Sequence, residues 1–215
     1  AEVQTLRHLV NVNQKQNKHE KVVEFANQGI PLAQGFDKAA LFWLSEALIA
    51  AYYQLGQVDD AHEATKQTIA AAHTIGEKDK EDCFMLSLAE SYMISEAYEA
   101  ALDTYILAHK ALTRRSRLVD MAHVTGRMGM VLAELDRVDE AIPYHQEAIE
   151  LARKHELPEL EGEQFTMLAM AYRESGDLAQ ARLACETAVT IYTNADLQDN
   201  AVKVKNLLAE MGKET

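Results

Sequence analysis

The chain has 215 residues, of which 48% are hydrophobic and 26% charged, a profile typical of a soluble globular protein with a substantial core. Its formal net charge of −13 repels phosphate backbones, so we expect no direct binding to nucleic acid. No apolar run approaches the roughly 18 residues of a membrane span. With only 9 glycines and 3 prolines, the composition favours helices and predicts an all-α fold.

In chain order, apolar periodicity predicts five helix pairs and one last helix, over residues 4–34, 37–75, 78–114, 117–155, 158–193 and 195–212. The first pair is a degenerate copy of the others. The last helix is amphipathic and can cap the pair before it, with its end expected at Gly212.

The second helices of the later pairs repeat at a constant interval, with the copies beginning at positions 56, 96, 136 and 176. Two columns are small, namely Ala61, Ala101, Ala141, Ala181 and Thr68, Ala108, Ala148, Ala188. Because two helices cross closely only where side chains are short, we expect these residues to be contact points that a larger neighbour fills.

The first helices repeat as well, with a large apolar column at Leu48, Leu88, Met128 and Leu168. A mostly small column follows at Ile49, Ala89, Gly129 and Ala169, and then Tyr52, Tyr92, Leu132 and Tyr172. The turn between the helices carries Gly56, Glu96, Asp136 or Gly176.

These columns resemble the tetratricopeptide repeat, over roughly residues 4–193. The period alone would favour HEAT or armadillo units of about 40–47 residues over the usual repeat of about 34. The column pattern instead favours an extended tetratricopeptide repeat, as in kinesin light chains and bacterial peptide-sensing regulators. The resemblance implies one domain over 1–215, a right-handed superhelical solenoid of five repeats plus a C-terminal capping helix, with eleven helices in all.

No catalytic motif is visible: HExxH, P-loop, GxGxxG and GxSxG patterns are all missing. We interpret GRMGM at 126–130 as a helix-packing feature, the basic stretch 110–117 as a solvated corner, and His145 as a structural or solvated histidine. Cys83 and Cys185 have no partner at metal-ligand spacing. We therefore expect no enzyme, no catalytic residue, no metal, no cofactor, and a reducing, cytoplasmic location.

The resemblance also implies a concave groove lined mainly by the first helices. Carried over column by column, its partner-binding residues are Arg7, Asn11, Trp43, Glu46, Tyr53, Leu86, Glu90, Met93, His123, Met130, Glu134, Thr166, Met170 and Arg173. The methionines suit a surface that adapts to an apolar partner, although they could instead be core. The glutamates indicate a partner with some basic character.

The leading interpretation is a non-enzymatic scaffold that binds a peptide or helix of a partner protein in this groove. The alternative is a sensory module of a larger bacterial signalling protein, beside a DNA-binding or nucleotide-cyclase domain. The start at AEVQ, without methionine, fits a processed or excised piece of a longer chain. Self-association through the terminal helices is a further option.

Overall fold

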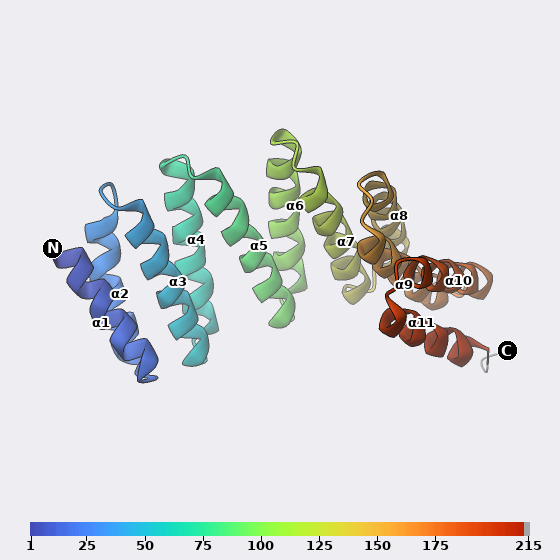
Figure 1. Ribbon diagram of the computed structural model, residues 1–215, viewed down its shortest axis with the longest axis horizontal. Helices are drawn as coiled ribbons and strands as arrows, with labels where there is room; N and C mark the ends of the chain where they lie inside the picture. The colour runs from blue at the N-terminus through green and yellow to red at the C-terminus, as the bar shows by residue number, and fades with distance from the viewer. Residues whose placement is uncertain (213–215) are drawn as a thin grey trace. The chain divides into compact units, whose positions relative to one another are not determined.

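The computed structural model describes residues 1–212, and within that range the chain forms eleven α-helices and no strand, as the sequence predicts (Figure 1). It divides into two compact units, Ala1–Ser91 and Tyr92–Thr215. That the whole chain forms a single domain stays a prediction.

The first unit contains four complete helices and most of a fifth: α1 (Glu2–Lys15), α2 (His19–Ala33), α3 (Lys38–Gln54), α4 (Val58–Thr74) and α5 (Lys78–Ile94). The second unit holds α6 (Tyr98–Arg114), α7 (Leu118–Glu134), α8 (Val138–Lys154), α9 (Pro158–Glu174), α10 (Leu178–Asn194) and α11 (Gln198–Met211). Within the second unit, helices that follow each other in sequence pack side by side (Figure 1).

Each helix from α3 to α10 ends in a turn whose middle residue has a positive φ. Gly56, at φ 71°, shows the geometry: its N–H donates to the carbonyl of Tyr53 (3.1 Å), and the N–H of Gln57 donates to that of Tyr52 (2.9 Å). This is the Schellman arrangement, which satisfies the last carbonyls of a helix. The same left-handed turn recurs at a constant spacing, at Gly56, Gly76, Glu96, Ser116, Asp136, Glu156, Gly176 and Asp196.

The alanines of the first small column are fully buried, as expected of residues where two helices pack closely. Ala61, Ala101, Ala141 and Ala181 are all 0% exposed. Large side chains of the first helices, such as Leu48, Leu88 and Leu168, are buried with them.

Replacing Ala141 by leucine should lower the free energy of unfolding by about 1–3 kcal/mol, because the added atoms overpack a fully buried crossing. Ala179→Leu, at an exposed position in the first turn of α10, is the matched control and should change stability by less than about 0.5 kcal/mol. Urea unfolding followed by circular dichroism measures both. An unchanged midpoint for Ala141→Leu would show that the crossing is not close-packed.

Candidate partner-binding surface

The predicted groove residues all lie on the first helices of the pairs, namely α1, α3, α5, α7 and α9. None of them is buried. Asn11, Glu46, Tyr53, His123, Glu134 and Met170 are exposed, while the other eight are half-buried. Met170 in particular is 49% exposed, so it is a surface residue rather than core. That these residues bind a partner stays a prediction.

In the first unit, Arg7 and Trp43 come together. The guanidinium carbon of Arg7 lies 5.3 Å from the centre of the Trp43 ring, within range of a cation–π interaction. The only tryptophan of the chain is therefore covered on one side by a neighbour on α1. A partner that used the Trp43 ring would have to share or displace Arg7.

Glu46 is already engaged by a cation of the same unit. Lys80 Nζ lies 2.9 Å from Glu46 Oε1, and the hydrogen bond to this carboxylate is the main reason that the pKa of Lys80 is raised. The ammonium also stands 5.6 Å from the Phe42 ring and 5.9 Å from the Phe84 ring. Lys80 belongs to a different helix, α5, so a comparison of columns within single helices does not reveal this pair.

Tyr53 belongs to a polar cluster with Ser91 and His62. The Tyr53 hydroxyl donates to Ser91 Oγ at 2.6 Å, and Ser91 Oγ lies 2.7 Å from His62 Nε2. Burial lowers the pKa of His62, the opposing effect of Asp59 being smaller. A serine beside a neutral histidine resembles a nucleophile and its base, but Ser91 lies inside a helix, where backbone N–H groups are used by the helix itself. The cluster therefore links α3, α4 and α5 rather than forming an oxyanion site.

In the second unit, three of the predicted residues line one cavity. Met130, Glu134 and Met170 surround a space of about 320 Å³, together with Ala133, Asp136, His145, Met167, Ala171 and Glu174. Met167 and Glu174 stand three residues before and four residues after Met170 on α9, so helical spacing alone could have added them to the predicted set.

A second cavity, of about 430 Å³, is also lined by Met167. It is lined by Thr166 and by residues of α9, α10 and α11, among them Glu159, Glu163, Tyr192 and Lys203. The Thr166 hydroxyl donates to the Gly162 carbonyl at 2.8 Å. The two cavities share Met167, so α9 lines both of them.

Three glycines lie behind these cavities, and a large side chain of another residue packs against each of them. A Cβ at Gly126 would lie 2.6 Å from the Gln164 amide, one at Gly129 2.7 Å from His145 Cε1, and one at Gly162 2.6 Å from the Tyr192 ring. The GRMGM stretch is thus a packing feature, as expected from the sequence.

His145 and Gln164 form a buried hydrogen bond behind the surface. His145 Nδ1 lies 2.9 Å from Gln164 Oε1, and the two side chains are 1% and 2% exposed. Burial lowers the pKa of His145, and the hydrogen bond to Gln164 offsets this only in part. The histidine is therefore structural and held in its neutral form, not solvated.

Among residues 1–212, no group of three or more His, Cys, Asp and Glu side chains is placed to hold a metal ion. None of the helices in that range is both long and apolar enough to cross a membrane. The features that distinguish the surface are therefore its methionines, its carboxylates and its cavities.

Comparison with known proteins agrees with the repeat pattern. Residues 119–194, all in the second unit, match the family model described as tetratricopeptide repeat. Protein KINESIN LIGHT CHAIN-RELATED 1 of Arabidopsis thaliana is 30% identical over 149 residues, which cover 67% of this chain and 24% of that protein. KINESIN LIGHT CHAIN-RELATED 2 of the same plant is 32% identical over 97 residues, or 44% of this chain and 15% of that protein. The chain thus spans a quarter or less of the length of these relatives.

Solved structures share the fold at lower identity. BtubC (BKLC) from P. vanneervenii has a TM-score of 0.68 at 21% identity, covering 90% of this chain and 81% of that one. The apo form of RapI has a TM-score of 0.75 at 12% identity, covering 99% and 59%. A signal transduction ATPase with a tetratricopeptide repeat sensor, from Pyrococcus horikoshii, has a TM-score of 0.69 at 16% identity, covering 92% and 30%.

The buried histidines predict how stability depends on pH. The pKa of His145 and that of His62 are both lowered in the folded protein, so below the unfolded value of about 6.5 the unfolded chain binds more protons. Stability should therefore be level above about pH 6.5 and fall as the pH drops from there towards the folded values.

Thermal melts between about pH 5 and 8 test this expectation, because most carboxylates stay ionised in that range. His145→Asn, which can still hydrogen-bond Gln164, should make the fall shallower, whereas His8→Asn, at an exposed histidine, should leave it unchanged. A fall of the same size in His145→Asn and the wild type would show that His145 does not contribute to the pH dependence.

Proposed function

We propose that this protein is a non-enzymatic scaffold that binds a peptide or helix on the face formed by its first helices. The proposal starts from the tetratricopeptide repeats, because proteins with such repeats are generally non-enzymatic scaffolds for protein or peptide partners. The observation that carries this proposal is the cavity lined by Met130, Met167 and Met170. Flexible, polarizable methionines at a partly exposed cavity suit a surface that repacks around an apolar side chain.

The charge around this cavity supports a partner with basic residues. Glu134, Asp136 and Glu174 line it, and the whole chain carries a net charge of −13. Opposite potentials speed the encounter of two proteins and exclude partners of like charge. The same surface disfavours nucleic acid, and with two free cysteines the cytoplasm is the compartment we propose.

A rival surface exists on the opposite side of α9. There, a cavity of about 420 Å³ is lined by Phe165, Leu168 and Tyr172, and by Leu183 of α10, which is 56% exposed. At about 100° per residue, these α9 positions point away from Met167 and Met170. Any test of the binding face must therefore compare these two sides.

A sensory module of a larger signalling protein is the second candidate. It is favoured by the fold shared with the sensor-bearing ATPase of Pyrococcus horikoshii, of which this chain covers 30%. In that case the bound peptide would be a signal, and an adjoining output domain would report it. Sequencing the gene on both sides of this segment separates the two candidates, since a DNA-binding or nucleotide-cyclase domain supports the sensor.

Peptides selected against the wild-type protein from a random display library should lose about tenfold or more in affinity for Met170→Glu, because a carboxylate would enter the methionine cavity. Leu183→Glu places the same charge on the rival surface and should bind as the wild type does. Isothermal calorimetry measures both, after circular dichroism has shown that each variant is folded.

The reverse result, in which Leu183→Glu abolishes binding and Met170→Glu does not, would place the partner on the opposite side of α9 and contradict the proposed face.

A further inference from the structure

The methionine cavity lies where two helices end. Met130, Ala133 and Glu134 lie in the last five residues of α7, and Met170, Ala171 and Glu174 in the last five of α9. The C-terminal end of a helix carries roughly half a negative charge from its macrodipole. Two helix ends and the carboxylates of Glu134, Asp136 and Glu174 thus give one small cavity a strongly negative potential.

Most charged groups around the cavity are acidic, and Arg173, beside Glu174 in the last turn of α9, is the exception on that helix end. The first turn of α8, at the same end of the helices, carries Asp139 and Glu140, and Asp177 caps α10 with its side chain. Arg137, which follows Asp136 in the turn between α7 and α8, donates two hydrogen bonds of 2.7 Å to the carboxylate of Glu140. These bonds are the main reason that the pKa of Glu140 is lowered. Arg127 lies 3.5 Å from Met130 Sδ but does not line the cavity.

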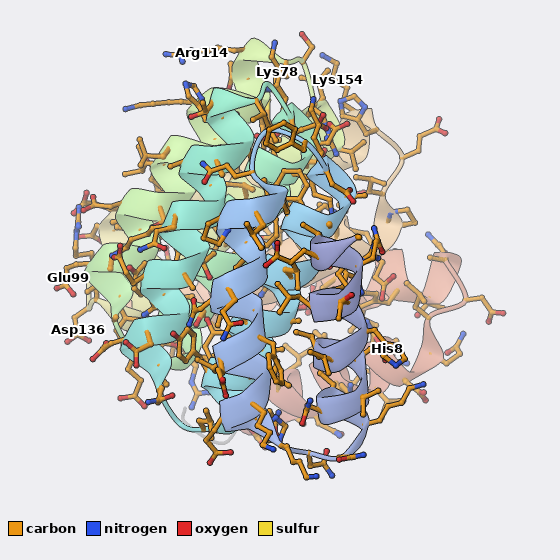
Figure 2. All side chains as sticks on the ribbon, turned by 90° about the vertical axis from the view of Figure 1, so that its left-hand side faces the viewer. His8, Lys78, Glu99, Arg114, Asp136 and Lys154 are labelled. Carbon is orange, nitrogen blue, oxygen red and sulfur yellow. The ribbon has the colours of Figure 1, made fainter. Side chains whose placement is uncertain are left out.

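The distribution of charged residues over the second unit also places acidic side chains at the end of the helices where the cavity lies. Figure 2 shows Glu99 and Asp136 pointing outward at one edge, while Arg114 and Lys154 lie towards the other end of the helices. Glu99 is in the first turn of α6, and Arg114 and Lys154 are in the last turns of α6 and α8. The cavity therefore lies at the acidic end of the unit, away from its basic stretch.

His145 lines the cavity, although it is only 1% exposed. Its Nδ1 lies 2.9 Å from Gln164 Oε1, and its ring packs against Gly129 of α7. The imidazole is therefore held in a fixed position and forms part of the inner wall of the cavity.

The walls suit the rest of a long basic side chain. Met130, Met167 and Met170, with two alanines, supply apolar surface in the same cavity as the carboxylates. Lysine and arginine pack their methylene stems against apolar surface and keep the charged group near water or an acid. Apolar and acidic lining residues together suit such a side chain.

We propose that this cavity binds an arginine side chain of the partner peptide, with its stem against the methionines and its guanidinium between the carboxylates of Glu134, Asp136 and Glu174. This proposal rests on the proposed function and specifies the chemistry of the partner. Arginine is chosen over lysine because its five N–H donors in a planar fork can reach several separate acceptors, and because its guanidinium is the more weakly hydrated cation. Tyr98 hydrogen-bonds Glu134, which holds that carboxylate in place.

The test uses the full chain with ¹³C-labelled methionine methyl groups, which give one NMR signal for each of the eight methionines. The probes are three blocked tripeptides, acetyl-Leu-Arg-Leu amide and its citrulline and lysine counterparts. Citrulline has the shape of arginine without the charge. The arginine peptide should shift the signals of Met130, Met167 and Met170 but not that of Met211, which is 0% exposed and outside the cavity.

The citrulline peptide should bind about tenfold more weakly, because hydrogen bonds to a charged group are the stronger ones. The double variant Glu134→Gln/Glu174→Gln should weaken the arginine peptide by about tenfold or more. Glu147→Gln removes the same kind of charge from an exposed position of α8 and should change nothing. Glutamine can still accept the Tyr98 hydrogen bond, so the variant tests charge rather than local folding.

Equal binding of the citrulline peptide, or no shift at the three methionines, would overturn the arginine site. Lysine binding as tight as arginine would overturn the choice of arginine. Any of these results can occur while library peptides still lose binding in Met170→Glu. In that case the arginine site fails and the binding face stands.

Discussion

The left-handed turn residue that follows each helix from α3 to α10 is the constraint on which the structure depends. Because it recurs at a constant spacing, from Gly56 to Asp196, it stops every helix at the same length and reverses the chain in the same way. Each of these helices has 17 residues, so the second helix of a pair has the same length as the first helix on which it packs in α3 and α4, α7 and α8, and α9 and α10. The alanine columns recur at the same interval and are fully buried. Glycine fills this turn position only after α3, α4 and α9, so the fold tolerates the cost of a positive φ at Glu96, Ser116, Asp136, Glu156 and Asp196.

This regularity explains why the fold could be predicted from the sequence. A repeated crossing requires a small residue at each copy, and a repeated column is visible without any structure. The helix number and all-α class were predicted correctly for residues 1–212. The repeat columns show the spacing from one helix pair to the next, but not that the turns after single helices are also evenly spaced. The turns at Ser116 and Glu156 could not be recognised from the sequence, because they carry no glycine, asparagine or aspartate.

The surface was less predictable, because it depends on contacts between residues from different columns. No pattern in the sequence indicates that Glu46 meets Lys80, or that Ser91 joins Tyr53 and His62. His145 occupies a column where the other copies have threonine, tyrosine or cysteine, so its position suggested tolerance. Its burial follows from Gly129 on the facing helix, which leaves room for an imidazole ring. The burial of His145 therefore depends on the match in size between residues of two columns, and it cannot be predicted from either column alone.

The same size matching shapes the face that we propose for binding. Glycines at 126, 129 and 162 admit Gln164, His145 and Tyr192, so that large polar side chains lie behind the surface. The methionines of α7 and α9 are left at the front, with the acidic helix ends beside them. Packing and binding are therefore linked: the residues that fix α8 and α10 against α7 and α9 also determine which side chains face a partner.

The proposed binding face is tested most directly by a crystal structure of the protein with a library-selected peptide bound. We expect the peptide to lie against the methionines of α7 and α9, with Met130 and Met170 in contact and Glu134 beside a basic residue. A peptide lying instead over Phe165, Tyr172 and Leu183, on the opposite side of α9, would contradict it.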